Sequence, residues 1–74
     1  MNNETTSNAN DHIYDILSTL PAGTTTISQI QVDDVLVDVT SFINLNRTEN
    51  LAYFTSPIGT TLIVDCHKIS LLVF

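Results

Sequence analysis

Two adjacent residues, Cys66 and His67, are the first candidates for chemistry in this sequence. A thiol beside an imidazole pairs a nucleophile with a general base. In an extended strand, neighbouring side chains point to opposite faces, so these two form a hydrogen bond only if a tight turn lies there. We therefore interpret Cys66 as a buried residue beside a half-exposed His67, and we expect no catalytic site.

A carboxylate and an imidazole also occur two residues apart, at Asp65 and His67. They share one face of a strand, and with Asp33 or Asp34 nearby they offer ligands to a divalent metal ion. The same spacing occurs in many strands by chance, and a hydrogen-bonded turn explains it more simply. We therefore predict no metal site, no cofactor and no enzymatic activity.

Acidic side chains dominate the charge, because eight Asp and Glu residues face two Lys and Arg residues and give a net charge of −6. The densest group is Asp33, Asp34 and Asp38, which forms either a solvated turn or a surface for a basic partner. Phosphate-binding proteins normally carry a basic patch, and Arg47 and Lys68 make one only when several copies assemble. The charge therefore favours a basic protein partner and disfavours nucleic acid and anionic membranes.

The length of 74 residues predicts one small domain with a thin margin of stability. Cys66 is the only cysteine, so a disulfide within the chain is excluded. A single cysteine without a signal-peptide pattern favours a reducing, cytoplasmic location. Oligomerisation is the remaining way to stabilise so small a domain.

The first half of the sequence predicts a tail and a helix. Residues 1–9 are polar and without periodicity, so we expect a disordered tail before a single domain, residues 10–74. A helix begins at Asn10 or Asp11 and ends before Pro21. Its apolar stripe follows the helical spacing and consists of Ile13, Ile16, Leu17 and Leu20.

From Thr24 onward the hydrophobic period is two, which predicts about five strands. We place them at residues 24–32, 35–45, 51–56, 60–66 and 69–74, with the odd positions of the second strand buried and a bend at Ser41. Short links between the strands imply antiparallel neighbours. The predicted fold class is α+β, an N-terminal helix followed by about five antiparallel strands in a small, strongly bent sheet or barrel.

Residues 64–70, Val-Asp-Cys-His-Lys-Ile-Ser, resemble the second Sm motif of the Sm-like fold in its bacterial Hfq form. In that motif a Lys-His pair precedes an Ala-Ile-Ser sequence. The order of one helix and five short strands also resembles the family over residues 10–74, and Asp33-Asp34 lies where Hfq has an Asn-Gly-type turn. Cys66 departs from the family, since it replaces the pore lysine.

The resemblance implies a ring, usually a hexamer, in which the last strand pairs with a strand of the next subunit. It also implies RNA binding around the pore, and His67 is the position that carries over. Residues 69–74 are almost entirely apolar and would be covered by such pairing.

We interpret the chain as a small acidic, non-enzymatic regulatory or adaptor protein. It would bind a protein partner, or its own copies, through its acidic surface and by strand pairing at residues 69–74, and inhibition of the partner is one version of this role. The alternative is an Sm-like oligomeric RNA-binding regulator. The expected binding residues under these two hypotheses are Asp33, Asp34, Asp38, Arg47, His67 and Lys68.

Overall fold

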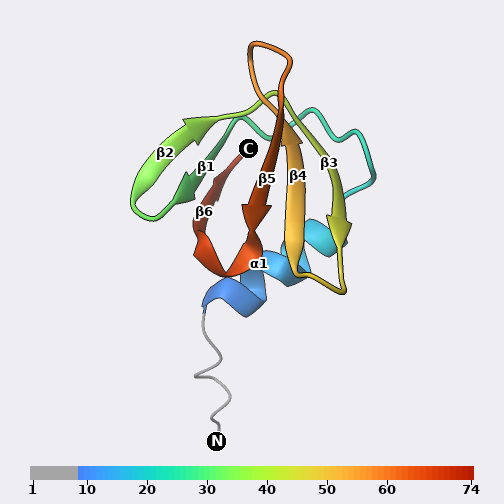
Figure 1. The fold of residues 1–74 in the computed structure, drawn as a ribbon, viewed down its shortest axis with the longest axis vertical. Coiled ribbons are helices and arrows are strands. Elements are labelled where there is room, and N and C mark those ends of the chain that lie inside the picture. The colour runs from blue at the N-terminus through green and yellow to red at the C-terminus, as the bar shows by residue number, and fades with distance from the viewer. Residues whose placement is uncertain (1–8) are drawn as a thin grey trace, which may run out of the picture.

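One helix precedes all the strands in the part of the chain that the structure, a computed structural model, describes, which is residues 9–74 (Figure 1). The tail expected at residues 1–9 lies outside this range except for Ala9. Helix α1 spans Ala9–Ser18 and ends before Pro21, since the next two residues form a turn. Ile13 and Leu17 are buried, whereas Ile16 is exposed, so the predicted stripe is narrower than expected.

Six antiparallel strands form two sheets of three strands each within residues 9–74. The strand order is β2-β1-β6 in the first sheet and β3-β4-β5 in the second, and a 3₁₀ helix, η2 (Cys66–Lys68), joins the two sheets between β5 and β6. The α+β class is therefore confirmed. The strands are β1 (Gln29–Val32), β2 (Val35–Asp38), β3 (Ser41–Asn46), β4 (Leu51–Thr55), β5 (Thr61–Asp65) and β6 (Ile69–Val73).

The structure has six strands within residues 9–74 instead of the predicted five, because the long strand predicted at residues 35–45 is divided. Its halves are β2 and β3, which belong to different sheets. Val39 and Thr40 separate the halves, with the Val39 N–H bonded to Ser28 O at 3.0 Å and the Thr40 N–H bonded to Thr55 O at 2.8 Å. The division therefore lies just before Ser41, where the bend was predicted.

The prediction that all the odd positions of residues 35–45 are buried is wrong. Val39 is buried, but so is Phe42, because the interruption between the two strands shifts the alternation by one residue. The pairing of β3 with β4 is also irregular between Phe42 and Asn44, which is typical of a β-bulge. Single-residue shifts of this kind reverse the face on which each following side chain lies.

The first predicted strand is shorter than residues 24–32, since β1 begins at Gln29. Thr24 forms only an isolated bridge with Phe42, in which the Phe42 N–H donates to Thr24 O at 2.8 Å. The segment between the bridge and β1 still contributes to the core through Ile27, which is buried.

The β1–β2 turn is at Asp33 and Asp34, as predicted. Their φ angles are 50° and 68°, so both residues have the left-handed conformation that a type I′ hairpin turn requires. Asp tolerates this conformation better than most residues with a side chain. A two-residue turn sets the register in which Val32 pairs with Val35.

The core lies where α1 packs against β6 and η2 and where the inner faces of the two sheets meet. At its centre, the rings of Phe42 and Phe54 meet edge to face, with centroids 5.6 Å apart. No helix within residues 9–74 has the length and apolar composition needed to cross a membrane. The buried apolar side chains are Ile13, Leu17, Ile27, Ile30, Val39, Phe42, Ala52, Phe54, Cys66 and Ile69.

Candidate functional site

Three connecting segments together carry most of the predicted binding residues, with the two turns on opposite sides of the molecule in Figure 1. They are the β1–β2 turn, the β3–β4 turn at residues 47–50, and η2. The Cys66 N–H donates to Asn50 O at 2.9 Å, and the Asp33 N–H donates to Lys68 O at 3.3 Å. These two backbone bonds hold both turns against η2.

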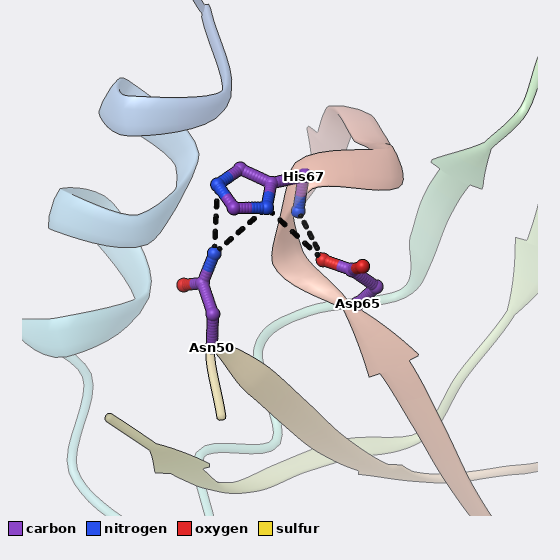
Figure 2. Close-up of polar contacts among 3 residues, drawn as sticks. All are labelled: Asn50, Asp65 and His67. Atoms are coloured by element: carbon purple, nitrogen blue, oxygen red, sulfur yellow. Dashed lines mark hydrogen bonds and ion pairs between the residues drawn. The ribbon is translucent and has the colours of Figure 1, made fainter. Parts of the chain in front are cut away.

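The imidazole of His67 lies between the side chains of Asn50, in the β3–β4 turn, and Asp65, the last residue of β5 (Figure 2). The Asn50 Nδ2 is 3.0 Å from His67 Nδ1 and 2.9 Å from Nε2. On the other side, Asp65 Oδ1 is 3.4 Å from His67 Nδ1 and accepts the His67 backbone N–H at 2.9 Å. Asn50, Asp65 and His67 therefore form one polar group, which we call the His67 cluster.

The Asn50 amide lies nearly equidistant from the two ring nitrogens of His67. Which of them accepts its hydrogen bond depends on the tautomer of the ring. The ring edge is exposed, so the cluster offers a partly ordered imidazole and an amide to a ligand in solvent. This arrangement suits recognition of a polar planar group better than covalent chemistry.

Asn50 was not among the residues predicted from sequence. It is 17 residues from His67 and comes from a different turn. A polar residue next to a strand is common, so no local signal separated it from its neighbours. Its place in the cluster follows from the pairing of β4 with β3 and β5.

Cys66 is fully buried in η2, whereas His67 points to the surface. Burial raises the pKa of the Cys66 thiol, the negative charge of Asp65 raises it further, and a backbone hydrogen bond opposes the change. A protonated, inaccessible thiol is a poor nucleophile. The interpretation of Cys66 as a core residue is therefore consistent with the structure.

We expect the Cys66 thiol to be protected by the fold. Iodoacetamide at pH 7.5 should alkylate the native protein at least about tenfold more slowly than the urea-unfolded chain, because only the unfolded chain exposes a reactive thiol. Mass spectrometry measures both rates. Equal rates in the two states would contradict the burial of Cys66.

The same thiol should make stability depend on pH in the alkaline range. Since the fold raises the thiol pKa, its contribution is fully present below the pKa of an unfolded thiol, about 8.5, and declines as the pH rises above that value. The urea midpoint should therefore fall more between pH 7 and pH 9.5 in the wild type than in Cys66→Ala. Equal falls would assign the change to other groups.

Arg47 begins the β3–β4 turn and lies against α1. Its guanidinium is 5.9 Å from the centre of the Tyr14 ring, within the range of a cation–π contact. It also lines a shallow cleft of about 190 Å³ between the end of α1 and β3, together with Leu17 and Asn44. Arg47 therefore shares its turn with Asn50 but points toward the helix.

The three predicted carboxylates do not form one group. Asp33 and Asp34 are in the β1–β2 turn, close to η2, whereas Asp38 is at the opposite end of the hairpin. There the Gln29 Nε2 donates to Asp38 Oδ1 at 2.9 Å. The structure thus places negative charge at both ends of the β1–β2 hairpin.

Asp65 and His67 do lie close together, as their spacing predicted, but the third group near them is the amide of Asn50. Within residues 9–74 there is no set of three His, Cys, Asp or Glu side chains with the geometry to hold a metal ion. No protein-family model, curated protein or solved structure matches this chain.

Proposed function

We propose that this protein is a small, non-enzymatic adaptor or regulator that assembles by strand pairing. The observation that carries the proposal is the pair of edge strands β5 and β6. Each has one strand neighbour within residues 9–74, β4 and β1 respectively, so its other backbone edge is available. An unpaired edge is a template for a strand of another chain.

The side chains on these edges support pairing with a second copy. Ile63 on β5 is 59% exposed and Phe74, just after β6, is 56% exposed. Natural edge strands are usually protected by charge or proline, and β6 has neither. Pairing β5 of one copy with β6 of the next covers both edges at once.

We further infer that the two sheets are halves of one strongly bent, barrel-like sheet. The chain passes directly from β2 to β3 through Val39 and Thr40, whose N–H groups bond to Ser28 O, just before β1, and to Thr55 O in β4. This is the arrangement that the Sm-like resemblance implies. Because β5 and β6 are then the two ends of one sheet, repeated pairing continues from copy to copy and can close into a ring.

Light scattering after size exclusion tests the assembly. We expect the wild type to have a mass at least twice the 8.1 kDa of one chain. Ile63→Lys should shift it toward the monomer, since a charge on an edge strand blocks pairing. The matched control is Ile58→Lys, at a position in the β4–β5 loop that is 85% exposed. A monomeric wild type, or the same mass in both variants, would rule out this mode of assembly.

A second candidate function, RNA binding, is favoured by the His67 cluster. An exposed imidazole and an amide adjoin Lys68, and a ring of copies repeats this group and collects the cations that one subunit lacks. Base edges are read by hydrogen bonds, and phosphates by cations. The net charge of −6 per subunit opposes this function, so it is our second choice.

A titration with fluorescein-labelled single-stranded RNA at several salt concentrations separates the two candidates. RNA binding by the cluster requires a wild-type signal that weakens with salt and falls in Lys68→Ala or Arg47→Ala. Unchanged binding in both variants, or no binding at all, leaves the adaptor function.

A further inference from the structure

The outer face of the β2-β1-β6 sheet carries a cross-strand row of two leucines with a glutamine between them. Residues directly opposite each other in an antiparallel sheet lie on the same face, and Gln31 pairs with Leu36 on one side and Leu71 on the other. Leu36 is 52% exposed, and Leu71 is 44% exposed. We call this surface, Leu36, Gln31 and Leu71, the outer row.

The outer row is not part of the core. The neighbouring positions Ile30, Val37 and Leu72 also form a cross-strand row, and they point to the other face, where they pack into the core. Folding therefore uses the inner row, while two leucine side chains on the opposite face remain accessible. Clustered exposed leucines on a small acidic protein indicate a surface for a partner.

Charge on either side of Leu36, along the direction of β2, restricts that partner. Asp33 and Asp34 are exposed in the turn at one end of β2, and Asp38 is exposed at its other end, on the same face as Leu36. The three strands themselves contain no Lys or Arg, and Lys68 precedes β6. A leucine between carboxylates, with a second exposed leucine two strands away on the same face, is complementary to an apolar stripe flanked by cations.

We propose that the outer row is the docking surface for a basic amphipathic helix of a partner protein. The proposal rests on the adaptor function and names the class of partner. Asp34 and Asp38 are four residues apart along β2, or roughly 13 Å. A helix spans that distance in about nine residues, so two basic residues about nine apart with leucine-type residues between them match the surface.

Fluorescence anisotropy with a labelled 18-residue Leu/Lys amphipathic peptide tests the surface. Leu36→Thr should weaken binding about tenfold, because it removes apolar contact area. Asp38→Asn should weaken it about threefold, since it removes one partly solvated ion pair but keeps an oxygen that accepts the Gln29 hydrogen bond.

The matched controls make the same two kinds of change, a shortened aliphatic side chain and a neutralised carboxylate, at other positions. Ile58→Thr also shortens an exposed aliphatic side chain, and Asp15→Asn makes the same change of net charge on α1. Both should bind the peptide as the wild type does. If Asp15→Asn and Asp38→Asn weaken binding equally, attraction is due to overall acidity and the proposal is wrong. Equal binding by Leu36→Thr and the wild type also overturns it.

Light scattering on the same samples distinguishes this proposal from the proposed assembly. Leu36→Thr should keep the wild-type mass, whereas a lower mass would make the outer row an interface between copies and overturn the docking proposal. A monomeric wild type that still binds the peptide at Leu36 would disprove strand-paired assembly and support the docking surface. An oligomeric wild type that does not bind the peptide would support strand-paired assembly and disprove the docking surface.

Discussion

Replacing Phe54 by alanine is expected to remove most of the free energy that keeps the protein folded at room temperature. The side chain is fully buried and its ring packs edge to face on Phe42. Removing a buried Phe typically costs about 3–5 kcal/mol, while whole domains are stable by only about 5–15 kcal/mol. A chain of this length is expected near the low end of that range.

Urea unfolding followed by circular dichroism measures this loss, and the neighbouring residue provides the control. Tyr53 is also aromatic but is on the opposite face of β4 and partly exposed. Tyr53→Ala should therefore cost about 1 kcal/mol. Equal losses in the two variants would mean that the face of β4 assigned to the core is wrong.

Deleting Ser70–Phe74 is expected to abolish cooperative folding. The deletion removes all but the first residue of β6, and with it the pairing of Gln29, Ile30 and Gln31 on that side of β1. It also removes the bond from the Ser28 N–H to Val73 O, 2.8 Å long. Helix α1 packs on β6 and, at ten residues, is too short to be stable without that contact.

Phe74→Ser is the control for the deletion, since Phe74 follows β6 and is exposed. It should keep a cooperative thermal transition, whereas the deletion should give none. The amide proton spectrum should likewise be dispersed in the point variant and collapsed in the deletion. A truncated chain that melts cooperatively would show that β6 is dispensable for the fold.

The helix illustrates how far the sequence predicts the fold. Spacing identified α1 and the burial of Ile13 and Leu17, because one apolar stripe suffices to dock a short helix. It placed Ile16 on the same stripe, yet this side chain is exposed. The helix packs on β6 and η2 through only part of its predicted apolar stripe. How much of the stripe is buried depends on the surface that the helix packs against rather than on the helix itself.

The β1–β2 turn was predictable because its chemistry is local. Asp33 and Asp34 tolerate the left-handed conformation that the hairpin requires. Two residues were enough to fix this turn. The strand ends beside it, Val32 and Val35, were predicted correctly, whereas the far ends of the two strands, at Gln29 and Asp38, were not.

The division of the long strand and the membership of the His67 cluster were decided by the tertiary structure. A bulge near Ile43 changes which side chains reach the core, and it forms only against the partner strand β4. Asn50 meets His67 because β4 lies between β3 and β5. This contact joins residues that are 17 positions apart in the sequence. The hydrophobic period and the chemistry of turns depend on a few neighbouring residues, so the elements that they determine can be predicted from the sequence. Strand pairing acts over tens of residues, so only the assembled sheets determine which side chains meet.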